Sequence, residues 1–128
     1  MKTFKEYAEA AEKTNTRPSP EYPFFGLSEE VGEVMGKISK RMRHNQMRSC
    51  FVLEALSRAS KQGDSYPEFK DLYQTREDII KELGDVLWYL NACCVELNVT
   101  LEEVAQQNIE KTHGRLERGT IVGEGDER

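Results

Sequence analysis

Two pairs of carboxylates are the residues of this sequence best placed to do chemistry. Glu30 and Glu33 lie three residues apart in SEEVGEV, and Glu82 and Asp85 have the same spacing in KELGDVL. Side chains at positions i and i+3 of a helix share one face, so each pair can be directed at one point. One such pair alone is common on solvated helix faces, and it is the repetition of the pattern that favours a functional site.

The chemistry that four converging carboxylates support is the binding of a metal ion. Carboxylates that meet in one place repel one another, and a hard divalent cation removes that repulsion. Ligation by oxygen atoms alone suits Mg²⁺ or Mn²⁺, with water and substrate phosphates completing the shell. No histidine accompanies either pair, which argues against zinc and against a di-iron carboxylate bundle.

Two helices must position these pairs. The first is expected to begin between Pro23 and Ser28 and to end near Arg43. The second is the most apolar helix of the chain, with a capping-box-like start at Thr75 and an end at Asn98. At about 100° per residue, both pairs fall at the same angular position beside the apolar stripe of their helix. If the two helices pack together, the four carboxylates converge at the edge of the core.

Each acidic pair also encloses a glycine, Gly32 in the first helix and Gly84 in the second. A glycine inside a helix costs about 1 kcal/mol relative to alanine. We therefore expect close backbone packing at both positions, either around a tight metal site or simply at a helix–helix contact.

Helical periodicity extends through most of the remaining sequence, and no strand-like alternation competes with it. Further helices are expected over residues 4–14 and 50–59, and from Thr100 to about Arg118, where Thr100 and Glu103 form a capping box. The chain is therefore predicted to be all-α, with four or five helices in a bundle.

The chain length predicts a single helical domain over residues 1–128. Residues 44–75 are its least regular part, and residues 119–128 form a charged, glycine-rich tail. The three cysteines lack metal-binding spacing, and buried or free thiols in a reducing cytoplasm are expected.

The overall charge excludes some classes of partner. A net charge of −5 makes the chain a poor partner for nucleic-acid polymers, whose phosphates attract basic surfaces. No apolar run reaches the roughly 20 residues of a membrane helix, and the first residues lack the apolar segment of a secretory signal. The sequence therefore predicts neither a membrane nor a nucleic-acid partner.

The segments around both pairs resemble the MazG-type, all-α nucleoside triphosphate pyrophosphohydrolases. GLSEEVGEVMGKISK and REDIIKELGDVLWYLNACC are similar to the two acidic motifs of that family, ExxE on one helix and ExxD on a later one. The resemblance runs from about Pro23 to the end of the chain, excluding the middle. The family usually has a shorter connection, so residues 44–75 look like an insertion that serves as a lid, a dimer contact or part of the base pocket.

This resemblance implies a Mg²⁺-dependent enzyme of nucleotide-pool house-cleaning. Such an enzyme cleaves a nucleoside or deoxynucleoside triphosphate to the monophosphate and pyrophosphate. The metal, with Mn²⁺ as a substitute, would bind the phosphates and activate a water against the α-phosphorus. The catalytic and metal-binding residues would be Glu30, Glu33, Glu82 and Asp85. Either Glu30 or Glu33 would also take the proton of the water, and the sequence does not say which.

The resemblance also implies substrate-binding residues. Tyr89 is similar to the family's nucleotide-contacting aromatic residue, and Asn108 to a contact with base or sugar. Lys111 and Arg115 match its phosphate-contacting basic pair. Trp88 lies opposite the apolar stripe, where an exposed side chain fits a subunit interface or stacking on a base across subunits. Family members bury additional apolar surface by oligomerising, so a homodimer or homotetramer is expected.

Two alternatives stay open from the sequence. One keeps the fold and changes the substrate to dUTP or phosphoribosyl-ATP. The other is a non-catalytic helical interaction module, in which the acidic faces serve only as solubilising charge.

Overall fold

The computed structural model describes residues 1–45, 49–59 and 67–122 of the chain. Within these ranges every regular element is a helix and no strand occurs, so the all-α prediction is confirmed. The five described helices are α1 (Phe4–Glu12), α2 (Tyr22–Asn45), α3 (Ser49–Arg58), α4 (Pro67–Glu96) and α5 (Leu101–Glu117).

The chain divides into two compact units. One is Pro18–Leu90, with α2, α3 and most of α4, and the other joins Met1–Arg17 to Asn91–Arg128, with α1, α5 and the last turns of α4. The single domain over residues 1–128 stays a prediction, as does the role of the tail, of which residues 123–128 lie outside the described ranges.

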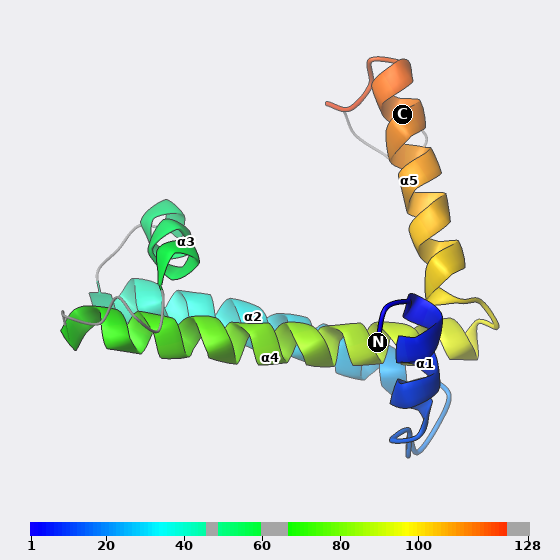
Figure 1. Cartoon of the computed structure of the whole chain (residues 1–128), viewed down its shortest axis with the longest axis horizontal. Helices are drawn as coiled ribbons and strands as arrows, with labels where there is room; N and C mark the ends of the chain where they lie inside the picture. Colours follow the sequence, from blue (N-terminus) through cyan, green and yellow to red (C-terminus); the bar gives the residue numbers. More distant parts are fainter. Residues whose placement is uncertain (46–48, 60–66, 123–128) are drawn as a thin grey trace. The chain divides into compact units, whose positions relative to one another are not determined.

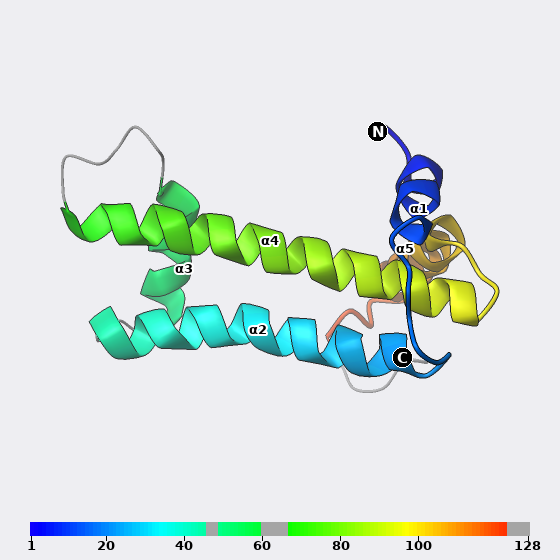
Figure 2. The same cartoon turned by 90° about the horizontal axis from the view of Figure 1, so that it is seen from below.

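In the unit Pro18–Leu90, α2 and α4 run side by side in opposite directions (Figures 1 and 2). Side-chain contacts mark their register: Tyr22 lies against Tyr89 near the start of α2, and Arg41 reaches Thr75 near its end. Because the pair is antiparallel, residues later in α2 face residues earlier in α4.

The core of this unit lies where α3 packs against both long helices. Val52 and Leu56 of α3 and Leu72 of α4 are buried, and Ile38 and Ile79 pack against them, with Met42, Ala55 and Ala59 at the edge. These buried residues belong to the part of the sequence that resembles an insertion. The segment is thus part of the fold: it supplies the apolar contacts that hold the C-terminal part of α2 to the N-terminal part of α4.

The predicted start of α4 at Thr75 is wrong, because the helix begins at Pro67. Proline suits the first position of a helix, where its missing N–H group has no partner to lose. Thr75 lies inside the helix, buried, and its hydroxyl donates to the backbone oxygen of Asp71 at 2.8 Å while it accepts a hydrogen bond from Arg41 Nε at 2.6 Å. Asp78, expected to complete a cap, instead accepts from the Gln74 side chain. The Thr75 hydroxyl thus joins α2 to α4 and caps nothing.

In the other unit the observed helix starts agree more closely with those predicted from the sequence. Thr3 accepts a hydrogen bond from the backbone of Glu6 and caps α1. Thr100 and Glu103 form the predicted capping box at the start of α5, each side chain accepting from the other's backbone N–H group. Asn98 lies in the α4–α5 connection and adopts the left-handed region, with φ of 54°, which asparagine tolerates better than most residues.

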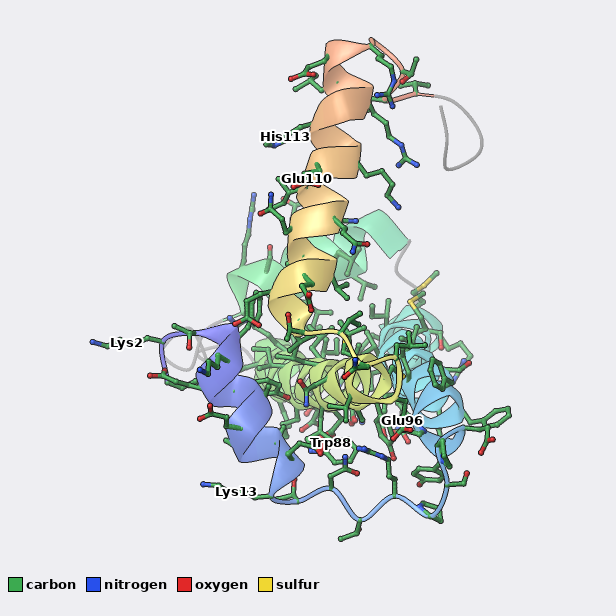
Figure 3. The ribbon with its side chains drawn as sticks, turned by 90° about the vertical axis from the view of Figure 1, so that its right-hand side faces the viewer. Lys2, Lys13, Trp88, Glu96, Glu110 and His113 are labelled. Atoms are coloured by element: carbon green, nitrogen blue, oxygen red, sulfur yellow. The ribbon has the colours of Figure 1, made fainter. Side chains whose placement is uncertain are left out.

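The core of that unit contains Ala11 of α1, Leu101 of α5 and the end of α4. Cys93 and Cys94 are buried free thiols, as expected, and burial raises the pKa of both. The side chain of Cys50 lies outside the described residues. Lys2 and Lys13 point away from the two ends of α1 (Figure 3). Among the described helices, none is both long and apolar enough to cross a membrane.

Candidate functional site

The structure brings three of the four predicted carboxylates together. Glu30 of α2 and Glu82 and Asp85 of α4 each offer a carboxylate oxygen, and these oxygens all lie within 4.8 Å of one another. Glu30 and Glu82 are half-buried and Asp85 is exposed. Spacing of i, i+3 places both α4 residues on the face that meets α2. The cluster is therefore a direct consequence of the antiparallel pairing of the two helices.

Glu33 lies outside this cluster. Its side chain is exposed and lines a groove one turn further along α2. A step of three residues rotates the side chain by about 60° from Glu30 and advances it by about 4.5 Å, so the two carboxylates of this pair point to neighbouring places. Glu33 remains close enough for its charge to raise the pKa of Glu30. The predicted convergence thus holds for three carboxylates, with the fourth beside them.

The electrostatics of the cluster favour a bound cation. Desolvation and then the negative charges of Asp85, Glu33 and Glu82 raise the pKa of Glu30. The neighbouring carboxylates therefore make ionisation of Glu30 harder. Several carboxylate oxygens within the reach of one ion, repelling one another, are the donor set that a hard divalent cation prefers. Glu30, Glu82 and Asp85 accordingly fit a metal site of the kind predicted from the sequence.

A lysine that the sequence analysis did not single out contacts the cluster. Lys37 Nζ lies 2.7 Å from Glu82 Oε1, and both side chains are half-buried. This hydrogen bond raises the pKa of the Lys37 ammonium group, so the group stays charged. Lys37 follows Glu33 by one helical turn, and that spacing was the available signal for placing it beside the acidic pair.

Aromatic rings stand on the other side of the acidic cluster. The rings of Tyr89 and Tyr22 are 6.1 Å apart and tilted by 53°, and the Tyr89 hydroxyl donates to the Tyr22 hydroxyl at 3.4 Å. This hydrogen bond and partial burial raise the pKa of Tyr89 to about 12. Trp88 packs edge-on against Tyr89, with centroids 5.0 Å apart. Trp88, labelled in Figure 3, is half-buried, so the expectation of an exposed side chain is wrong.

Gly26 needs the small size of glycine. It is buried, and a Cβ atom there would lie 2.5 Å from Tyr89 Cζ and 2.6 Å from Tyr89 Cδ1. The Tyr89 ring therefore rests directly on the backbone of α2. At Gly32 and Gly84 a Cβ atom would meet nothing within 4 Å, so the close packing predicted at these two positions is wrong.

The remaining predicted substrate contacts lie on α5, in the other compact unit. Asn108 and Lys111 line a hollow of about 280 Å³ together with Val104 and Gln107. Arg115 lies one turn further along and is half-buried. Their assignment to the nucleotide stays a prediction.

Replacing two of these glycines, Gly26 and Gly84, with alanine should have opposite effects on stability. Gly26→Ala places a methyl group in the Tyr89 ring and should lower the melting temperature by several degrees. Gly84→Ala adds a methyl group in open space and should raise the free energy of unfolding by up to about 1 kcal/mol. Thermal denaturation followed by circular dichroism measures both.

The combination with Tyr89→Leu tests the cause of the Gly26→Ala effect. If the ring is what the methyl group meets, Gly26→Ala should cost much less in the Tyr89→Leu background than in the natural chain. An equal cost in both backgrounds would contradict this packing.

Comparison with known proteins agrees with this geometry. Residues 19–119, which include all of α2 to α5, match the MazG nucleotide pyrophosphohydrolase domain. The gene 37 protein of Mycobacterium phage L5 is 34% identical over 107 residues, which is 84% of this chain and 75% of the phage protein. No solved structure matches. The resemblance read from the two acidic motifs is thereby confirmed, and the chain belongs to the MazG nucleotide pyrophosphohydrolase domain family.

Proposed function

We propose that this chain is a Mg²⁺-dependent pyrophosphohydrolase of nucleoside or deoxynucleoside triphosphates, acting in nucleotide-pool house-cleaning. Membership of the family supports pyrophosphohydrolase chemistry in general. The observation that carries the proposal is the group of three carboxylates from two helices, with oxygens within 4.8 Å of one another. An enzyme of this kind needs such a group to bring a divalent cation to the phosphates.

In this proposal Glu30, Glu82 and Asp85 hold Mg²⁺, for which Mn²⁺ can substitute, and Glu33 contributes from the adjacent turn. The bound ion supplies charge neutralisation at the phosphates and a more acidic water. The half-buried position of Glu30 and Glu82 limits competing solvent at the cluster. Lys37 holds the Glu82 carboxylate by its hydrogen bond and so restricts its orientation.

The proposed reaction forms one bond and breaks one. The oxygen of a water molecule bonds to the α-phosphorus, and the bond from that phosphorus to the α,β-bridging oxygen breaks. Pyrophosphate leaves with the bridging oxygen, and the nucleoside monophosphate keeps the oxygen of the water. A carboxylate of the first pair, Glu30 or Glu33, accepts the proton of the water.

Tyr89 is the proposed contact for the nucleotide base, supported by the arrangement of its ring between Tyr22 and Trp88. The α5 residues Asn108, Lys111 and Arg115 are proposed to contact the sugar or base and the phosphates. The free, buried thiols of Cys93 and Cys94 support a place in the cytoplasm, where cysteines stay reduced.

The activity should be visible as release of pyrophosphate. Incubation with Mg²⁺ and each of the eight common NTPs and dNTPs should yield pyrophosphate and a monophosphate, with no orthophosphate. Glu33→Ala and Asp85→Ala should each lower kcat by at least about 100-fold, with unchanged helical circular dichroism.

Glu110→Ala, which removes an exposed carboxylate of α5 (Figure 3), is the matched control and should leave kcat unchanged. The panel also includes dUTP and phosphoribosyl-ATP. Release from dUTP alone would identify dUTP as the substrate, and release from phosphoribosyl-ATP alone would identify that compound in place of a nucleoside triphosphate. No release from any of these compounds would favour the non-catalytic module.

The metal site should also be visible in stability. Asp85→Asn removes one negative charge from the cluster and leaves the Lys37–Glu82 pair, whereas Glu82→Gln removes the charge and the pair together. In metal-free buffer Asp85→Asn should therefore melt higher than Glu82→Gln. Saturating Mg²⁺ should raise the melting temperature of the natural chain by several degrees and that of either variant much less. Equal Mg²⁺ effects in all three proteins would contradict this metal site.

The sign of the pH dependence follows from Glu30. Its pKa is raised above 4.5 in the folded chain, so the protonated form favours folding. In metal-free buffer the melting temperature should therefore fall as the pH rises through the raised pKa of Glu30, because the carboxyl group then ionises. Glu30→Gln should remove that fall.

We further propose that the chain works as a homodimer or homotetramer. Val31 and Met35 of α2 and Ile80 and Leu83 of α4 are each about half exposed within the chain, which is unfavourable for apolar side chains in water. A second copy that covers them would bury this surface.

Sedimentation equilibrium should give a mass two or four times 14.7 kDa. The double variant Met35→Glu, Leu83→Glu should lower the mass to that of one chain. The matched control Ile109→Glu changes a half-exposed apolar residue of α5 and should leave the assembly intact. A natural chain that sediments as a monomer would overturn this proposal.

A further inference from the structure

A groove extends from the acidic cluster along α2 and α4. It has a volume of about 580 Å³ and lies in the unit Pro18–Leu90. Glu33 and Lys37 line it, and Lys37 also bonds to Glu82, so groove and cluster share a boundary. Its size is within the range of small-molecule sites.

The antiparallel pairing of α2 and α4 places different kinds of side chain in a fixed order along the unit. Tyr22 meets Tyr89 at one end, Glu30 meets Asp85 in the middle, and Arg41 meets Thr75 at the other end, in the lining of the groove. Lys37 lies seven positions after Glu30, which is about 10 Å along the helix. Aromatic, acidic and basic groups therefore follow one another in a line.

On the α2 side of the groove, two of the lining residues are glycines, which have no side chain. Gly32 and Gly36 lie one turn apart and line the groove, and a Cβ atom at either would meet nothing within 4 Å. Two glycines inside a helix lower its stability relative to alanine. No packing contact of the described chain explains them, and the room that they leave lies inside the groove.

Three basic side chains line the same groove. Lys37 is held by Glu82, and Arg41 is held by the Thr75 hydroxyl and by the backbone oxygen of Asp71 at 2.9 Å. Lys40 adds a third positive charge from the exposed side of α2. A lysine ammonium group acts as a point charge and the planar guanidinium group of arginine as a directed donor, and both suit phosphate oxygens.

The groove also contains carboxylates, namely Glu29, Glu33 and Asp78. Alone these would repel a free phosphate, but pyrophosphate and triphosphates bind Mg²⁺ tightly enough to bring a cation with them. A mixed lining of basic groups and carboxylates therefore suits a magnesium-bound diphosphate better than a bare anion.

We propose that this groove binds the β- and γ-phosphates of the substrate and retains the pyrophosphate product, through Lys37, Lys40 and Arg41. The proposal rests on the proposed function and gives the nucleotide a direction: the base lies toward Tyr89 and the leaving group toward Arg41. The α-phosphorus then lies at the acidic cluster between them.

Inorganic pyrophosphate with Mg²⁺ is the probe, because it tests the leaving-group site without hydrolysis. Titration calorimetry should show that Lys40→Gln weakens its binding by about tenfold, as expected for the loss of one charge-assisted contact. Arg43→Gln makes the same charge change three residues further along α2, outside the groove lining, and should leave the affinity unchanged. Amide NMR signals of Gly32 and Gly36 should shift on addition of the probe.

Measurements of product inhibition separate this inference from the proposed function. In an active enzyme, Lys40→Gln should raise the inhibition constant of pyrophosphate and leave that of the monophosphate unchanged. If nucleotides are hydrolysed and Lys40→Gln binds pyrophosphate normally, the inference is overturned and the proposed function stands. Weakening by Lys111→Gln in place of Lys40→Gln would also overturn it. Binding that depends on Lys40 in a chain that hydrolyses no nucleotide would support the groove and remove the proposed reaction.

Discussion

Mutual repulsion among Glu30, Glu82 and Asp85 is the constraint that the rest of the unit Pro18–Leu90 must overcome. Carboxylates within 4.8 Å of one another push α2 and α4 apart in the absence of a cation. Desolvation, and then the charges of Asp85, Glu33 and Glu82, raise the pKa of Glu30. The helices are held together on both sides of the cluster. Buried apolar residues of α3 join them beyond one end, and the Tyr22–Tyr89 contact joins them beyond the other. The repelling charges thus lie between two attachments, and Lys37 offsets part of their repulsion.

This arrangement explains why residues far from the cluster matter to it. Val52 and Leu56 belong to the buried apolar cluster, and they fix α2 against α4 where Thr75 and Arg41 also bond across the pair. At the opposite end, the absence of a side chain at Gly26 lets the Tyr89 ring lie on α2. Because both attachments set the same helix register, a change at either end alters how closely the oxygens of Glu30 and Asp85 approach.

Features that depend on helical periodicity could be predicted from the sequence. Prediction failed where a contact between residues far apart in the sequence determines the structure. Matching angular positions were enough to bring Glu30, Glu82 and Asp85 together, because two straight helices conserve the angle of every side chain. The capping box of α5 was predictable for the same reason, since it involves residues three apart. Thr75 has the same local pattern, but its hydroxyl is taken by Asp71 and Arg41, the latter from another helix. Glycine spacing pointed to Gly32 and Gly84, whereas the close contact at Gly26 is made with a ring far away in the sequence.

The acidic net charge of the chain hides an ordered separation of charge along one helix. In α2 the carboxylates Glu29, Glu30 and Glu33 come first, and Lys37, Lys40 and Arg41 follow toward the C-terminal half. Glu33 precedes Lys37 by four residues, a spacing at which opposite charges stabilise a helix, so this order does not itself lower the stability of α2. The glycines that interrupt it are different, because Gly32 and Gly36 lower the stability of α2 and leave only open space. A charged helix alone would be expected of any solvated surface, whereas a charged helix that also keeps an empty wall beside its basic half has the form of a binding site.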